Sequence, residues 1–305
     1  MDGKIKKSAD VKIFMNNNMP EIPDISAQEL LSSYHEGLKE AVDFVQSKVI
    51  GVLSGQINLK QQEEAVLGIF YRTHTLASSL VRLNNKIDFG AVASIARTIF
   101  ELLLDIKLLS SSKVKRKDLD RFFAFPEVSR YRTASKIVDL QKNHPELANN
   151  SLLNSAERRK FVDEPGKASD IEKKVVLLWG RDSKGKPNWP KYWFGRSIRK
   201  HAETFGPWYE QEYLEVYSLL SSYTHGGSSG YSGFSDKALE SVYGISLEYA
   251  RKMYIESLLI CSNLFNLKEG IESFTQIVTF LKNAPKQILI DYKLKEFKAR
   301  KDNKV

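Results

Sequence analysis

Apolar residues recur at every third or fourth position along most of this chain, which is the spacing of one face of an α-helix. Long stripes of this kind predict helices over about 26–45, 58–83, 89–110 and 207–224. Ser26 and Glu29 have the spacing of a capping box at the start of the first helix, and Asn58 can cap the second. The segment 89–110 is apolar on nearly every side, so we expect it to be the central, most buried helix. No stretch shows sustained alternation of apolar and polar residues between hairpin turns. The pattern therefore predicts an all-α bundle of long antiparallel helices.

Turn-forming residues and prolines divide the rest of the chain. Residues 180–193 contain glycine, serine and two prolines and predict a loop inserted into the bundle. Pro126 should kink or break the helix that contains it. We expect an irregular N-terminal arm at 1–24, a single helical domain with one core at 25–283, and a basic C-terminal helix or tail at 284–305. Further helices are expected at about 117–143, 151–162, 168–178, 195–204, 237–267 (with a break near Gly244), 269–282 and 284–300.

Composition places the chain among ordinary globular proteins, because 42% of its residues are hydrophobic and 27% are charged. The single cysteine, Cys261, cannot form an internal disulfide. No apolar segment follows the N-terminal Met-Asp-Gly-Lys, so we expect no secretory signal. The most apolar helix, 91–109, carries four charged residues, which argues against a membrane span. We therefore expect a cytoplasmic protein, and the frequency of symmetric dimers alone leaves a homodimer open.

The net charge of +9 is concentrated in two stretches, 179–201 and 282–305. All four tryptophans lie within 179–208, and aromatic rings beside cations suit the binding of single-stranded nucleic acid. RNA or another anionic partner is therefore expected. In the alternative interpretation the tryptophans fix the loop to the core and the cations are ordinary solvated surface. The candidate nucleic-acid-binding residues are Lys191, Trp193, Arg196, Arg199, Lys200 and His201.

Four charged residues interrupt the apolar helix at 89–110, and three of them are evenly spaced. Arg97, Glu101 and Asp105 follow one another at intervals of four and therefore lie on nearly one face. A buried charge is costly unless it is paired or lines a wet cavity. These residues predict either a polar pocket in the bundle or a structural arginine–glutamate pair that holds two helices together.

The helix at 207–224 ends in the motif Ser222-Tyr-Thr-His225-Gly226. His225 is expected at the C-terminus of this helix, where it can serve as a general acid/base near neutral pH or as a capping residue. Ser218, Ser222 and Tyr223 are expected to line the same pocket as Asp105. The chain lacks a phosphate-binding glycine loop, a dinucleotide fingerprint and a zinc-ligand spacing, so we expect no metal and no cofactor.

Two motifs together resemble a family of bacterial helical proteins known only as a domain of unknown function. They are the Arg97-x-x-x-Glu101 helix and the later Ser222-x-x-His225-Gly helix end, and the resemblance extends over roughly residues 60–265. That family looks related to the HEPN group of prokaryotic defence and toxin systems, which includes ribonucleases. The resemblance implies an RNA-directed protein, with cleavage by a metal-independent mechanism through Arg97, Glu101 and His225. The alternative is a non-catalytic binding or scaffold module in which the same three residues form a buried structural network.

Overall fold

The computed structural model describes residues 26–112, 114–148, 155–224 and 235–302. Within these ranges the chain forms helices and no β-strand, which confirms the all-α prediction. No described helix is both long and apolar enough to cross a membrane.

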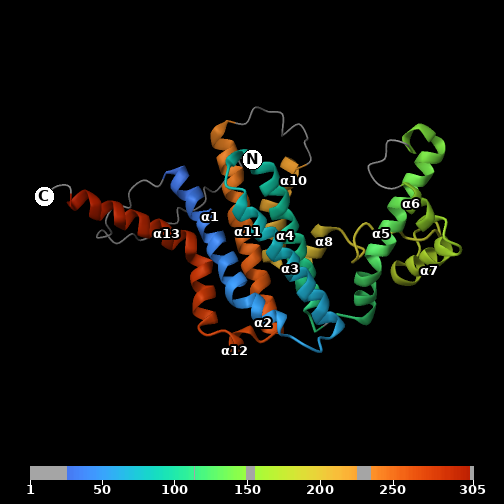
Figure 1. The fold of residues 1–305 in the computed structure, drawn as a ribbon, viewed down its shortest axis with the longest axis horizontal. Coiled ribbons are helices and arrows are strands. Elements are labelled where there is room, and N and C mark those ends of the chain that lie inside the picture. Colours follow the sequence, from blue (N-terminus) through green and yellow to red (C-terminus); the bar gives the residue numbers. More distant parts are fainter. Residues whose placement is uncertain (1–25, 113, 149–154, 225–234, 303–305) are drawn as a thin grey trace, which may run out of the picture.

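The main bundle is built around two central helices, α4 (Phe89–Leu109) and α11 (Asp236–Leu264), which pack along each other (Figure 1). α1 (Ala27–Phe44) and α3 (Gln61–Arg82) pack against this pair, and α13 (Phe274–Asp302) packs against α1. Nearly half of α4 is fully buried, including Ile99, Phe100 and Leu103. The helix that is apolar on nearly every side therefore lies at the centre of the bundle, as its pattern predicts.

Shorter elements complete the bundle and link its long helices. Most of those that matter for the site follow the loop after residue 179 and lie beside α4. Their bounds are α2 (Ile50–Ser54), α8 (Ile198–Glu203), α9 (Pro207–Glu212), α10 (Ser218–Thr224) and α12 (Leu267–Gly270), with π-helical turns at Val45–Val49 and Tyr213–Tyr217 and 3-10 turns at Lys86–Asp88 and Pro145–Ala148.

A second, smaller lobe projects from the bundle and consists of α5 (Arg116–Asn143), α6 (Ser155–Val162) and α7 (Lys167–Trp179), as Figure 1 shows. It buries its own apolar cluster around Tyr131 and Val175. The structure therefore has two hydrophobic clusters where the sequence predicted one core, because α5 leaves the bundle and closes on α6 and α7 instead.

Two prolines and one glycine lie inside continuous helices, although the sequence predicted breaks near them. α5 continues through Pro126, which is exposed, and α13 continues through Pro285. The ring of Pro285 packs on Gly37 of α1, where an added Cβ would lie 2.9 Å from its Cγ. α11 likewise continues through Gly244, where an added Cβ would lie 2.6 Å from Leu31 Cδ2. These breakers are tolerated because tertiary packing outweighs the local cost of one lost hydrogen bond or an entropic penalty.

The start of α1 follows its sequence signal. The amide of Glu29 donates to Ser26 Oγ at 3.2 Å, and the amide of Ser26 donates to Glu29 Oε2 at 2.7 Å, which is the capping box expected there. The N-cap residue of α3 is Lys60, two residues after the expected cap, Asn58. Asn58 has a positive φ of 58° in the preceding turn, and the amide of Lys60 donates to Glu63 Oε2 at 2.7 Å.

Candidate functional site

Arg97 of the central helix α4 donates hydrogen bonds to α10 and to the π-helical turn Tyr213–Tyr217 that precedes it. Its Nη1 donates to Thr224 Oγ1 at 2.7 Å, and its Nη2 donates to Tyr217 Oη at 3.1 Å. The guanidinium also lies 4.9 Å from the centroid of the Tyr217 ring, within the range of a cation–π contact. Position 97 on α4 and the last turn of α10 are thus tied together by a charged side chain.

Glu101 completes this cluster one helical turn further along α4. Tyr217 donates its hydroxyl hydrogen to Glu101 Oε1 at 2.6 Å, and Arg97 Nη2 lies 3.6 Å from the same oxygen. The Arg97 and Glu101 side chains are 16% and 32% exposed, so the cluster lies at the edge of the bundle within reach of solvent. Burial and the hydrogen bond to Glu101 raise the pKa of the Tyr217 phenol, so Tyr217 is a neutral donor at physiological pH.

Tyr217 and Thr224 were not selected from the sequence. They are spaced i, i+7 and lie on the inner face of the helix with buried Leu220, whereas the sequence favoured the serine face. Ser218 instead donates its hydroxyl to the Tyr213 carbonyl at 3.0 Å, and Ser222 donates to the Leu219 carbonyl at 2.7 Å. The apolar stripe at positions 217, 220 and 224 was the signal that could have identified the correct face.

Tyr223 and His225 are the other two residues predicted for this helix end. Tyr223 is half-buried, and its ring meets that of Phe89 edge-on at 6.4 Å between centroids. His225 lies outside the described residues, directly after Thr224 in the sequence.

Asp105 lies a further turn along α4 and faces the tryptophan-rich loop. Trp193 Nε1 donates to Asp105 Oδ1 at 2.8 Å. Burial raises the pKa of Asp105 to about 7 against the lowering effect of the Trp193 hydrogen bond, and the negative charge of Glu101 adds to the rise. Asp105 therefore changes its protonation state near neutral pH. It does not contact Arg97.

Two of the six candidate nucleic-acid-binding residues are buried. Trp193 is 7% exposed and packs edge-on against Phe122. Its carbonyl oxygen accepts a hydrogen bond from the indole nitrogen of Trp179 at 2.8 Å. His201 is 3% exposed and stacks on Phe194 at 4.8 Å between ring centroids. Neither ring is presented to solvent, so the expectation that they stack on bases is not met by this structure. Trp193 instead follows the alternative interpretation, in which tryptophans fix the loop to the core.

The other four candidates, Lys191, Arg196, Arg199 and Lys200, are exposed. Arg196 and Lys200 line a shallow recess of about 490 Å³ beside Glu203. Glu203 also accepts a hydrogen bond from Arg199 Nε at 2.9 Å. The recess therefore presents two cations that other described side chains do not neutralise by an ion pair. Trp193 is hydrogen-bonded to Asp105, which lies on the polar face of α4 with Arg97 and Glu101. This hydrogen bond places the segment that carries these cations beside that face.

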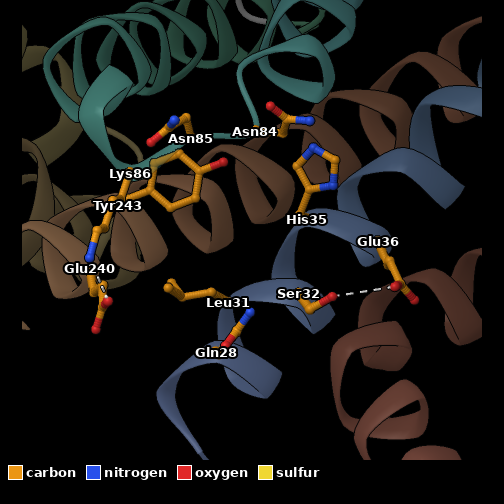
Figure 2. A pocket seen from close by; sticks show the side chains of 10 residues that line it. All are labelled: Gln28, Leu31, Ser32, His35, Glu36, Asn84, Asn85, Lys86, Glu240 and Tyr243. Carbon is orange, nitrogen blue, oxygen red and sulfur yellow. Dashed lines mark hydrogen bonds and ion pairs between the residues drawn. The ribbon is translucent and has the colours of Figure 1, made fainter.

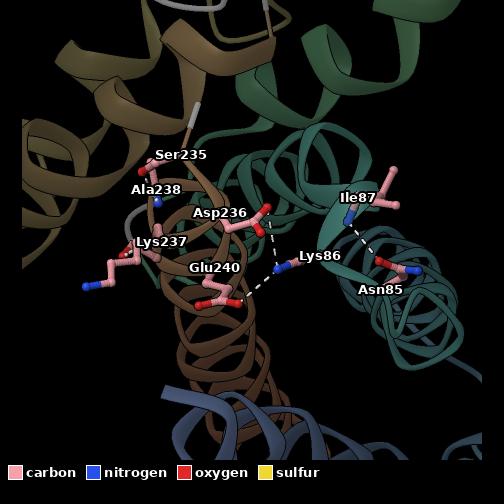
Figure 3. A network of polar contacts seen from close by, with 9 residues as sticks. Asn85, Lys86, Ile87, Ser235, Asp236, Lys237, Ala238 and Glu240 are labelled. Carbon is pink, nitrogen blue, oxygen red and sulfur yellow. Dashed lines mark hydrogen bonds and ion pairs between the residues drawn. The ribbon is translucent and has the colours of Figure 1, made fainter. Parts of the chain in front are cut away.

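A separate pocket of about 550 Å³ opens between α1, α11 and the turn after α3, on the side of Gln28, His35 and Asn84 (Figure 2). Its cation, Lys86, is held by Glu240 at 3.0 Å and Asp236 at 3.6 Å (Figure 3). Since its only lysine is paired in this way, the pocket offers amides and hydroxyls but no available positive charge. We therefore place the candidate functional site at Arg97.

Metal binding finds no support in the described part of the chain, where no three histidine, cysteine, aspartate or glutamate side chains gather as a ligand set. The chemistry available at the Arg97 cluster is that of a cation and a carboxylate 3.6 Å apart, with a phenol hydrogen-bonded to both. Such a cluster can bind an anion or transfer a proton.

Fold and site together define an all-α protein with a charged cluster set against its central helix. The chain belongs to the Family of unknown function (DUF5677), whose family model matches residues 63–239, more than half of the chain. The matched region runs from α3 into the start of α11 and so contains Arg97, Glu101, Tyr217 and Thr224. No match was found among curated proteins or among solved structures. The resemblance to a family of unknown function is thereby confirmed.

Proposed function

We propose that this protein acts on RNA and cleaves it without a metal ion, in the cytoplasm, as part of a prokaryotic defence or toxin-type system of the HEPN kind. The observation that carries the proposal is the Arg97–Glu101–Tyr217 cluster. It places a partly exposed cation and carboxylate on a central helix that is largely apolar. Charges at such a position are costly, and they are retained most readily where they bind or transform a ligand.

Arg97 would hold the scissile phosphate, since a guanidinium pairs well with phosphate oxygens. Glu101 orients Arg97 through the 3.6 Å ion pair, and Tyr217 links the two side chains. His225 would move the proton. The ribose 2′-hydroxyl would lose its proton and attack the adjacent phosphorus, and the bond from phosphorus to the 5′-oxygen would break as that oxygen is protonated. The exposed cations Lys191, Arg196, Arg199 and Lys200 would hold the strand along the same side of α4.

This mechanism is tested by the product that it requires. Labelled single-stranded RNA is incubated with the protein in excess EDTA, beside the same strand with 2′-deoxy sugars. We expect RNA fragments with 2′,3′-cyclic phosphate ends, no cleavage of the deoxy strand, and loss of cleavage in His225→Ala. Arg82→Ala is the matched control, because Arg82 is an exposed arginine of α3 outside the cluster. Cleavage of the deoxy strand, or full activity of His225→Ala, contradicts the mechanism.

One observation favours a second candidate, a non-catalytic binding or scaffold module. The contacts of Arg97 reach Thr224, Tyr217 and Glu101, and so tie α10 to α4 as a structural network would. If that is its role, Arg97→Ala should lower the free energy of unfolding by about 3–5 kcal/mol, as broken buried pairs do. The functional proposal expects a folded variant that has lost activity.

A further inference from the structure

A further cleft lies between the bundle and the small lobe. It has a volume of about 880 Å³ and is lined by α3, α5 and α6, away from the Arg97 cluster. Three arginines, Arg72, Arg130 and Arg158, face it together with one carboxylate, Glu157. The lining is therefore cationic on balance, and its volume falls within the range of small-molecule sites.

Two of these arginines carry positive charge that no described side chain neutralises by an ion pair. Neither Arg72 nor Arg130 forms an ion pair or a hydrogen bond through its side chain with another residue of the described ranges. The neighbouring Glu127 does not compensate for them, since it is held by Lys167 at 2.8 Å and Lys174 at 2.5 Å. Their guanidinium groups are thus available to an anionic ligand.

Two hydroxyl groups face the same cleft from one side of α5. Ser129 and Thr133 are spaced i, i+4 and both line the cleft. Most serines and threonines of the bundle helices donate to the carbonyl four residues earlier, as Thr73 does to Ile69 at 2.9 Å. Ser129 and Thr133 make no such bond within the described part of the chain. Free hydroxyls beside free guanidinium groups are the donors that phosphate oxygens require.

Aromatic side chains complete the lining. Phe125 and Phe161 border the cleft, and the guanidinium of Arg130 lies 4.4 Å from the centroid of the Phe161 ring. That contact fixes the position of Arg130 through the ring and leaves its N–H groups for a ligand. The Phe161 ring is also contacted by Lys167 Nζ at 5.1 Å from its centroid, so a base would stack on Phe125, as bases do on aromatic side chains.

We propose that this cleft binds a nucleotide, with its phosphate on Arg72, Arg130 and the hydroxyls of Ser129 and Thr133, and its base against Phe125. The nucleotide is either free or one residue of an RNA strand. The second case rests on the proposed function.

The test measures fluorescence anisotropy with two probes, a labelled adenosine 5′-monophosphate and a labelled single-stranded RNA of roughly ten nucleotides. The full-length protein is compared with Arg72→Gln and Arg130→Gln at one fixed salt concentration. Arg159→Gln is the matched control, because Arg159 is exposed on α6 next to Arg158 and does not line the cleft. Circular dichroism confirms that each variant is folded.

We expect Arg72→Gln and Arg130→Gln each to weaken binding about tenfold, the usual effect of losing one charge-assisted hydrogen bond, while Arg159→Gln changes it little. Weakened binding of both probes supports a site for a free nucleotide, and weakened binding of the RNA alone supports a subsite for the strand. Equal affinities in all four proteins, or no binding of either probe, overturns the proposal. Arginine-dependent binding without any RNA cleavage would refute the proposed function and leave this site in place.

Discussion

The indole nitrogen of Trp193 donates a hydrogen bond to Asp105 at 2.8 Å and so fastens the tryptophan-rich loop to the central helix. The acceptor is an acid whose pKa is raised to about 7 by burial. This bond holds the exposed cations of residues 191–200 in a fixed position beside α4. The raised pKa of Asp105, which burial causes against the lowering effect of this bond, makes the stability of the protein depend on pH.

Replacement of Asp105 by asparagine should remove that dependence. Between its usual pKa of 3.8 and about 7, the folded protein keeps a proton that the unfolded chain loses. The free energy of unfolding therefore falls as pH rises through this window. Asp105→Asn retains an oxygen acceptor for Trp193 and should be more stable than the unaltered protein by roughly 1–3 kcal/mol at pH 8. Urea denaturation at pH 5 and pH 8 measures this, and a difference of equal size at both pH values would contradict it.

His201 should give the opposite dependence. Burial, with the positive charge of Arg196, lowers its pKa to about 4, so the folded protein holds the neutral ring while the unfolded chain takes up a proton below about 6.5. The stability that the neutral His201 ring contributes is fully present above about pH 6.5 and is lost as the pH falls toward 4. His201→Phe keeps an aromatic ring between Phe194 and Phe205 and should be more stable than the unaltered protein at pH 4.5 by roughly 1–2 kcal/mol.

The control for this experiment is His144→Gln, because His144 is exposed at the end of α5. It should leave the acid dependence unchanged. If His201→Phe loses stability between pH 7 and pH 4.5 as steeply as the unaltered protein, His201 is not the group responsible.

Two glycines in helices should respond to alanine with opposite signs. A Cβ at Gly37 would lie 2.9 Å from the ring of Pro285, so Gly37→Ala should force α1 and α13 apart and cost about 1–3 kcal/mol. A Cβ at Gly68 in α3 meets nothing within 4 Å, so Gly68→Ala should stabilise the helix by about 0.5–1 kcal/mol. Thermal denaturation of the two variants measures the sign of each change in stability. Stabilisation by Gly37→Ala would show that α1 and α13 do not pack as described.

The long helices were predictable because each buries one stripe of apolar residues at helical spacing. The centrality of α4 and the capping box at Ser26 and Glu29 followed from local sequence in the same way. The continuity of α5 through Pro126 and of α13 through Pro285 was not predictable, since it depends on packing between distant segments. The separate cluster of the small lobe depends on such contacts as well.

The candidate site was predictable in part. The spacing of Arg97 and Glu101 on one apolar helix indicated a charged pair, and the structure contains it at 3.6 Å. Their partner Tyr217 was missed because the prediction placed the serine face of this helix toward the pocket, whereas Tyr217 and Leu220 form the inner face. The burial of His201 was missed because a basic sequence around a histidine does not reveal the phenylalanines that enclose it.

The most direct test of the central claim measures RNA cleavage and folding of Arg97→Ala in the same sample, with EDTA present. If Arg97 holds the scissile phosphate, the unaltered protein cleaves single-stranded RNA, and Arg97→Ala is folded by circular dichroism but loses at least about a hundredfold in rate, in proportion to the lost phosphate contact. Undiminished cleavage by folded Arg97→Ala, or intact RNA with the unaltered protein, would contradict the claim.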